Sequence, residues 1–129
     1  MFERIVVGVA RVETAQKAAR YGIDLASKLG AELHLVTAFS GSDTSPAAPE
    51  RQHAEGFLES IALSSPLPIR THALPGDPAA AILRVAGEIG ADLIVVGNKG
   101  MHGASRILGS VPNNIAHKTD CSILIVSTT

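Results

Sequence analysis

The sequence predicts an α/β protein with an open, doubly wound parallel sheet of five strands and helices on both faces. Four short runs are rich in Val, Ile and Leu, at residues 4–10, 32–38, 91–97 and 121–127. Segments with apolar residues at helical spacing separate these runs. A helix-to-strand junction at 29–33 is repeated almost unchanged at 89–93. Because strands that alternate with helices pair in parallel through right-handed crossovers, we expect a doubly wound sheet.

The predicted strands differ in how fully they are covered. The runs at 4–10, 91–97 and 121–127 are nearly continuously apolar, which is typical of strands buried on both faces. A fifth, weaker strand is expected at 68–74. Three polar residues interrupt it, which favours a place at an edge of the sheet: Arg70, Thr71 and His72.

Local signals predict where the helices begin and end. Apolar residues recur at helical spacing in 15–29, 54–61 and 82–89, and a fourth helix is expected at 111–118. Asp77 and Pro78 suit the N-cap and the first helical position of the third helix. Gly30 and Gly90 are typical of helix C-termini. Residues 40–49 are of low complexity, and we expect a surface loop there.

Length and composition restrict the class of protein. The chain has 129 residues, so we expect a single domain over residues 1–129 with one core. A net charge of −1 and the lack of a basic run argue against nucleic-acid or membrane-surface binding. The apolar run near Met1 is too short for a secretion signal or a membrane span, so a cytoplasmic protein is expected. The single cysteine, Cys121, is expected to be a buried thiol.

A glycine-rich loop from Gly97 to Ser110 follows one predicted strand and precedes the helix at 111–118. Glycines let the backbone approach an anion closely, and N–H groups at a helix start lack partners within the helix. No acidic residue occurs from 93 to 119, whereas three basic residues do, and Ser110 can add a hydroxyl donor. The pattern favours phosphate binding, with a plain surface loop as the alternative.

No catalytic or metal-binding constellation is evident in the sequence. The five histidines do not fall at metal-ligand spacing with one another or with Cys121. We expect His34 to be a strand residue with satisfied hydrogen bonds and the others to lie at the surface: His53, His72, His102 and His117. The motifs of a Ser-His-Asp hydrolase, a Walker loop and a dinucleotide fold are missing.

The loop carries a resemblance to the universal stress protein family, in its nucleotide-binding branch, and the resemblance covers essentially the whole chain. The branch has a signature of Gly, two residues, Gly, nine residues, then Gly and Ser or Thr. Its fixed positions correspond to Gly97, Gly100, Gly109 and Ser110. Only eight residues separate Gly100 from Gly109, one fewer than in the signature, so a tighter loop is expected.

The resemblance implies a strand order of 3-2-1-4-5 and a ligand beyond the carboxyl ends of the first and fourth strands, where doubly wound sheets bind ligands. The implied ligand is ATP or another adenine nucleotide, which Mg²⁺ can accompany. The nucleotide-binding positions carried over are Gly8, Val9, Ala10, Val36, Val96, Gly97, Asn98, Gly100, Met101, Gly109, Ser110 and Val111. The implied role is stress response or regulation.

One position departs from the family pattern. The family usually has Asp followed by Gly-Ser at the end of the first strand, where this chain has Ala10, Arg11 and Val12. That aspartate is associated with the adenosine part of the ligand. Losing one charge-assisted hydrogen bond costs on the order of 1.5–3 kcal/mol, which is about ten- to a hundredfold in affinity. Arg11 is either a phosphate contact or a surface residue.

Three functions therefore stay open: a nucleotide-binding stress protein, a slow ATP phosphohydrolase, and a signalling or structural module that has lost its ligand. No general base and no carboxylate for Mg²⁺ occur in the loop, so hydrolysis should be slow at most. We also expect a homodimer through residues 121–127, because that edge strand carries no charge or proline to discourage pairing.

Overall fold

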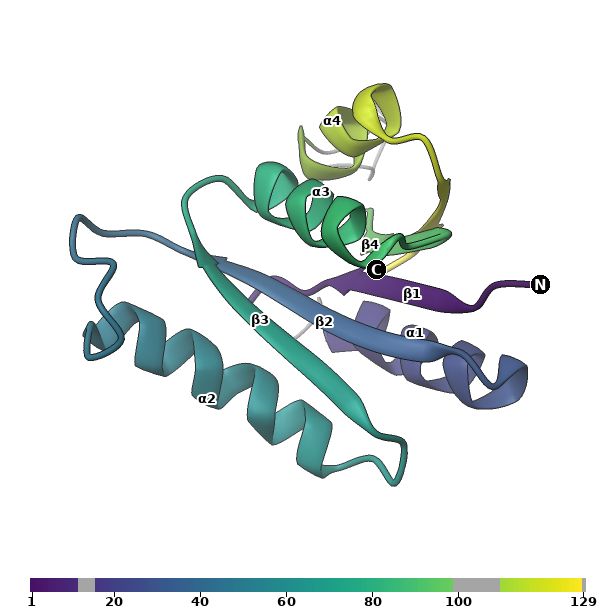
Figure 1. Cartoon of the computed structure of the whole chain (residues 1–129), viewed down its shortest axis with the longest axis horizontal. Coiled ribbons are helices and arrows are strands. Elements are labelled where there is room, and N and C mark those ends of the chain that lie inside the picture. Colours follow the sequence, from purple (N-terminus) through teal and green to yellow (C-terminus); the bar gives the residue numbers. More distant parts are fainter. Residues whose placement is uncertain (12–15, 99–109, 129) are drawn as a thin grey trace.

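The computed structural model describes residues 1–11, 16–98 and 110–128, and strands and helices alternate along them (Figure 1). The elements are β1 (Arg4–Gly8), α1 (Gln16–Leu29), β2 (Glu32–Phe39), α2 (Pro49–Leu63), β3 (Ile69–Pro75), α3 (Pro78–Ile89), β4 (Leu93–Gly97), α4 (Ser110–Lys118) and β5 (Ser122–Val126). All neighbouring strands pair in parallel, in the order β3-β2-β1-β4-β5. The expected fold and strand order are confirmed.

Helices cover both faces of the sheet. Helices α1 and α2 lie on one face and α3 and α4 on the other (Figure 1). Each face has its own core: Ala19 and Leu58 belong to the first, whereas Ile82 and Ile115 belong to the second. The expectation of one core was wrong, because a sheet between two helical layers separates the apolar side chains into two clusters. Among the described residues, no helix is long and apolar enough to cross a membrane.

The local signals at helix ends are confirmed. The Asp77 carboxylate accepts a hydrogen bond from the Ala80 N–H at 2.9 Å, and Pro78 begins α3. Gly90 has φ of 69° and Gly30 has φ of 65°, the left-handed conformation that favours glycine after a helix.

Several expected boundaries were wrong by one or two residues. β1 ends at Gly8 instead of Ala10, because Val9 makes the last backbone bond to β2 and Ala10 is exposed. α2 begins at Pro49, which was assigned to the loop, since proline needs no N–H partner in the first helical turn. The remaining strands start or stop within two residues of the expected ends. Strand β3 lies at one edge, as expected, and β5 lies at the other.

Candidate functional site

The carboxyl ends of β1 and β4 lie side by side at the point where the chain changes faces. β1 pairs with β4 from Ile5 to Val7, and the sheet continues through β2 on one side and β5 on the other. The connections around β1 run over one face through α1 and over the other through α3. In doubly wound sheets, ligands bind beyond the carboxyl ends of the strands at this reversal. The predicted residues at the ends of both strands therefore share one end of the sheet.

At the end of β1, hydrogen bonds hold the backbone in one arrangement. The Val9 N–H donates to the Val36 carbonyl at 2.8 Å, and the Thr37 hydroxyl donates to the Val9 carbonyl at 2.7 Å. Val9, Val36 and Val96 are each at most 3% exposed, with Val9 in the core on the α1 face and Val36 and Val96 in the core on the α3 face. Ala10, which follows Val9, is exposed.

Two glycines allow close packing at the same end. A Cβ on Gly8 would lie 2.3 Å from Ile82 Cδ1 and 3.3 Å from Val96 Cγ1. A Cβ on Gly97 would lie 2.9 Å from Thr128 Cγ2. Glycine therefore lets α3 and the C-terminal segment lie against the strand ends. Close packing alone is a sufficient reason for glycine at both positions.

Asn98 ties the end of β4 to the C-terminal segment. Its N–H donates to the Val126 carbonyl at 2.9 Å. Its Oδ1 accepts hydrogen bonds from the Thr128 N–H at 2.9 Å and the Thr128 hydroxyl at 3.0 Å. The Asn98 side chain thus already has a structural role.

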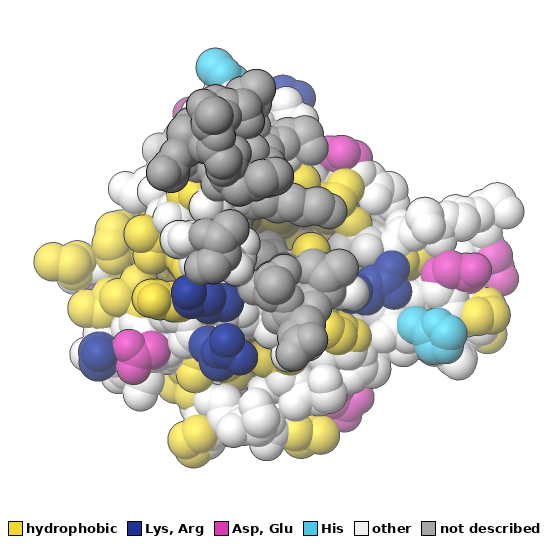
Figure 2. Space-filling view, turned by 180° about the vertical axis from the view of Figure 1, so that it is seen from behind, with side chains coloured by type: hydrophobic (Ala, Val, Ile, Leu, Met, Phe, Trp, Pro, Cys, Tyr) yellow, Lys and Arg dark blue, Asp and Glu magenta, His cyan; other side chains and the backbone are white. Residues whose placement is uncertain are grey.

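The predicted phosphate-binding residues are described only in part. Gly100, Met101 and Gly109 lie outside the described residues, and so does His102. Helix α4 begins at Ser110, and its first turn contains no acidic residue. Val111 is partly buried and packs against the core beneath α3. Seen from behind, the described surface beside the grey residues carries several Lys and Arg side chains (Figure 2). A helix start without carboxylates suits an anion.

Sequence reasoning missed two polar residues at this end. Thr37 is only 4% exposed and carries the hydrogen bond to Val9 described above. Thr128 bonds to Asn98, thirty residues away in the chain. A hydroxyl inside the apolar run at 32–38 was the available signal for Thr37, whereas Thr128 gave none.

A second polar cluster joins β2 and β3 on the α3 face. His34 is 1% exposed, and its Nδ1 lies 2.8 Å from His72 Nε2 while its Nε2 lies 2.6 Å from the Glu32 carboxylate. An ionised carboxylate only accepts, so His34 donates from Nε2 and, when neutral, accepts from His72. This confirms the satisfied state of His34. The expectation for His72 was wrong: it is partly buried and stacks on His34, because the α3 face of β3 is partly covered.

We expect this cluster to make the protein less stable in mild acid. Burial, followed by the nearby His34, holds the pKa of His72 below its ordinary value of 6.5. The unfolded chain therefore binds more protons just below pH 6.5, so the free energy of unfolding should fall as the pH drops through 6.5. His72→Gln should make the free energy of unfolding less dependent on pH, as measured by urea titrations from pH 7.5 to 5. The same substitution at His53, which is exposed, should leave the pH dependence unchanged. An unchanged slope in His72→Gln would contradict this account.

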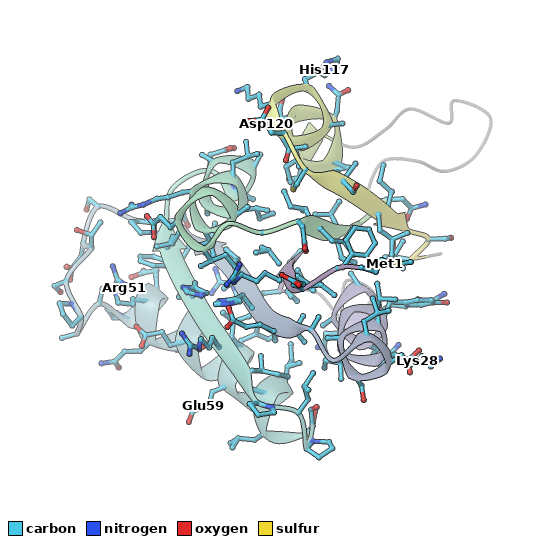
Figure 3. The ribbon with its side chains drawn as sticks, turned by 45° about the vertical axis from the view of Figure 1, so that its right-hand side comes forward. Met1, Lys28, Arg51, Glu59, His117 and Asp120 are labelled. Carbon is cyan, nitrogen blue, oxygen red and sulfur yellow. The ribbon has the colours of Figure 1, made fainter. Side chains whose placement is uncertain are left out.

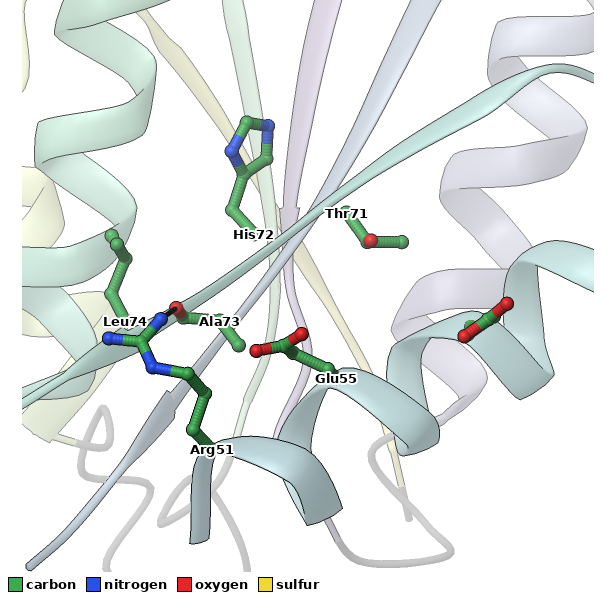
Figure 4. Close-up of a pocket in the computed structure, with 7 residues that line it drawn as sticks. Arg51, Glu55, Thr71, His72, Ala73 and Leu74 are labelled. Atoms are coloured by element: carbon green, nitrogen blue, oxygen red, sulfur yellow. Dashed lines mark hydrogen bonds between the residues drawn. The ribbon is translucent and has the colours of Figure 1, made fainter. Parts of the chain in front are cut away.

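Two cavities on the described surface lie away from the predicted site. One of about 330 Å³ runs between α2 and β3 (Figure 4). The other, of about 510 Å³, lies at the amino ends of the strands beside Met1 and Cys121. Cys121 is partly exposed there, with its Sγ 3.1 Å from the Thr119 hydroxyl. Cys121 was expected to be buried. It is partly exposed because it lies just before β5, at the amino ends of the strands beside the second cavity.

Comparison with known proteins agrees with the fold. The model of the universal stress protein family matches residues 1–127. A universal stress protein of Mycobacterium tuberculosis is 42% identical over 83 residues, which cover 64% of this chain and 51% of that protein. The chain thus spans about half the length of that relative. A universal stress protein of Methanocaldococcus jannaschii is 28% identical across 98% of this chain and 82% of its own length.

Solved structures extend the likeness. A universal stress protein in complex with cAMP superposes with a TM-score of 0.81 and 27% identity, covering 99% of both chains. One from Archaeoglobus fulgidus in complex with dAMP has a TM-score of 0.71 and 19% identity over 97% of both chains, a likeness that shows the fold. With the family match over residues 1–127 and the order β3-β2-β1-β4-β5, this chain belongs to the universal stress protein family.

Proposed function

We propose that this universal stress protein binds an adenine nucleotide, with ATP as the candidate, and acts as a stress-response or regulatory protein of the cytoplasm. The observation that carries the proposal is the placement of the start of α4, at Ser110, directly after the glycine-rich segment that follows β4. Solved relatives in complex with cAMP and dAMP support the ligand class.

The proposed pose assigns different parts of the nucleotide to different elements. Phosphates lie at the start of α4, where backbone N–H groups lack partners within the helix and the helix dipole favours anions. Gly97, Gly100, Gly109 and Ser110 contribute to this half. The base and sugar lie over the exposed Ala10, at the strand ends where the backbones of Val9, Val36 and Val96 lie. Mg²⁺ would be held by the phosphates, because the two segments of the proposed site, residues 8–11 and residues 96–111, contain no carboxylate.

Calorimetry with ATP, AMP, cAMP and adenosine tests the proposal. ATP is expected to bind more tightly than adenosine, because the site recognises the phosphates through α4. Mass spectrometry of the gently denatured protein should also release a co-purified adenine nucleotide. If none of the four ligands binds and none is released, the chain is a signalling or structural module without a ligand.

Ala10→Asp is expected to tighten binding of adenosine-containing ligands by several-fold. A carboxylate accepts a charge-assisted hydrogen bond that the methyl group of Ala10 cannot, and the exposed position accommodates the larger side chain. Calorimetry with adenosine isolates this effect from the phosphates. An unchanged affinity in a folded variant would mean that the pocket depends on other contacts.

The site favours binding over rapid hydrolysis. Its described residues, at 8–11, 96–98 and 110–111, provide no carboxylate or histidine to activate water. Hydrolysis of ATP should therefore be slow, and binding itself should carry the signal. Steady phosphate release well above background would favour the phosphohydrolase instead.

We also propose a homodimer through residues 121–127. Among the described residues, β5 pairs with β4 alone, and its Leu124 is 39% exposed. The Asn98 N–H donates to the Val126 carbonyl, so the backbone groups of Val126 and Leu124 face β4, and those of Ile123 and Ile125 face away. A second copy can satisfy those outward groups by antiparallel pairing and cover Leu124.

Leu124→Lys is expected to convert the dimer into a folded monomer. Its side chain is exposed, so lysine disturbs the interface and leaves both cores intact. Proline at the same position is less selective, because it removes an N–H that faces β4. Leu63→Lys, which changes a leucine that is 79% exposed on α2, is the matched control. If sedimentation shows that the unmodified protein is already a monomer at micromolar concentration, the proposed dimer is wrong.

A further inference from the structure

The sheet has a second open edge, on β3, whose backbone groups are only partly used. The Gly76 N–H donates to the Phe39 carbonyl at 3.0 Å, which fixes the direction of the ladder between β2 and β3. Backbone groups of successive residues in a strand point to opposite sides. Ile69, Thr71 and Ala73 therefore direct their N–H and C=O groups away from β2, toward the edge.

The carboxyl half of this edge is already closed. Pro75 has no N–H to offer a further strand. Arg51, from α2, donates from Nη1 to the Ala73 carbonyl at 3.3 Å and from Nη2 to the Thr44 carbonyl at 3.0 Å. The Arg51 guanidinium also lies 4.9 Å from the centre of the Phe39 ring. The part that stays open extends from Ile69 to the Ala73 N–H.

A groove that contains two carboxylates runs along this open part. The cavity of about 330 Å³ is bounded by β3 on one side and by α2 on the other (Figure 4). Glu55 extends from α2 toward β3 (Figure 4). Glu59 lies one helical turn further along α2 (Figure 3). Both carboxylates are exposed, and neither forms an ion pair with any residue in the described ranges. The groove thus combines open main-chain groups of β3 with two carboxylates, and the Arg51 guanidinium lies at its closed end.

We propose that the open part of the β3 edge binds an extended, basic peptide segment of a partner protein as a sixth strand. Main-chain hydrogen bonds to Thr71 and Ala73 would supply affinity, as in other cases of strand addition. Side chains alternate across the added strand, so every second one faces α2. Lys or Arg at those positions pairs with Glu55 and Glu59, which gives the edge its selectivity.

A second copy of this chain fits the edge less well. Two-fold pairing of β3 with itself would bring Glu55 and Glu59 of one copy toward the same carboxylates of the other. Like charges that face each other across an interface oppose association. The carboxylates therefore discourage self-pairing at this edge and favour a cationic strand.

Three synthetic peptides test the proposal on the full-length protein. The first is a capped seven-residue peptide of alternating Lys and Val, the second replaces Lys by Glu, and the third carries methyl groups on alternate backbone nitrogens. The Lys peptide should slow hydrogen exchange at the amides of Thr71 and Ala73, and the other two should not. If the Lys peptide protects neither amide, or if the Glu or methylated peptide protects them equally, the proposal is wrong.

Protein variants separate charge from main-chain pairing. Glu55→Lys combined with Glu59→Lys should weaken binding of the Lys peptide by at least about tenfold. As a control, Glu3→Lys makes one such charge reversal elsewhere on the surface and should leave binding unchanged. Thr71→Pro removes an N–H that is not bonded to β2. The Lys peptide should then no longer slow hydrogen exchange at the Ala73 amide. If the Glu55/Glu59 variant binds the Lys peptide as tightly as the unmodified protein does, the proposal is wrong. This result is conclusive even if the proline variant fails to fold. If the protein self-associates and Thr71→Pro abolishes that association, the β3 edge binds a second copy of this chain and the proposal is wrong.

Discussion

Replacing Gly22 with valine is expected to lower the free energy of unfolding by about 2–3 kcal/mol. Gly22 lies in α1 where the helix touches β1, and a Cβ there would lie 2.4 Å from Val7 Cγ2. Val7 is fully buried and β-branched, so its side chain has little freedom to move aside. The added atoms would push α1 away from the sheet and weaken the core of that face.

Two other helical glycines provide matched controls for this prediction. For Gly56 in α2 and Gly87 in α3, no neighbouring atom of the described part of the chain lies within 4 Å of an added Cβ. Valine there is expected to change stability by no more than about 0.5 kcal/mol, because valine is a slightly better helix former than glycine. Urea unfolding of the three variants gives the comparison. Equal stabilities would show that α1 does not pack against β1 as described.

Ser110→Asp is expected to weaken ATP binding by tenfold or more while leaving adenosine binding nearly unchanged. The substitution places a negative charge at the start of α4, where we propose that the phosphates lie. Like charges about 4 Å apart near a protein surface repel by several kcal/mol. An aspartate at a helix start is compatible with the helix, so the fold should be retained or slightly stabilised.

Three further variants refine this prediction. Ser110→Ala removes only the hydroxyl donor and should have a smaller effect, again on ATP more than on adenosine. Gly109→Val, outside the described residues, should crowd the approach of the phosphates. Ser60→Asp makes the same change of charge on α2 and should leave both ligands unaffected. If calorimetry shows equal losses for ATP and adenosine in Ser110→Asp, the start of α4 is not the phosphate site.

The features that were predictable from the sequence depend on residues close together in the chain. Asp77, Pro78 and Gly90 mark the ends of α3 because capping involves neighbours within a turn. The apolar runs mark β1 and β4 as buried strands because burial on both faces removes polar residues from them. The prediction was wrong for the run at 121–127, because β5 lies at an edge of the sheet and is only partly buried. The strand order came from the resemblance to the family, since local patterns do not specify which strands become neighbours.

The features that were missed depend on residues far apart in the chain. Thr37 bonds to Val9, Asn98 bonds to Thr128, and His72 stacks on a histidine of the neighbouring strand. Each pair forms only after the strands have aligned, so even a signal such as the Thr37 hydroxyl inside an apolar run does not identify the partner residue. The edge contact of Arg51 with β3 is of the same kind, because a surface arginine on a helix looks identical in sequence whether or not it reaches a carbonyl.

An NMR titration of the isotope-labelled protein with ATP tests the central claim most directly, because it locates the ligand without any substitution. The account predicts that the amides of Ala10, Gly97, Asn98 and Val111 shift together and saturably, with Ser110 among the largest changes. Adenosine should move Ala10 but leave Ser110 and Val111 nearly unchanged. Saturable shifts confined to another part of the molecule, such as β3, or no saturable shifts at millimolar ATP, would contradict the proposed site.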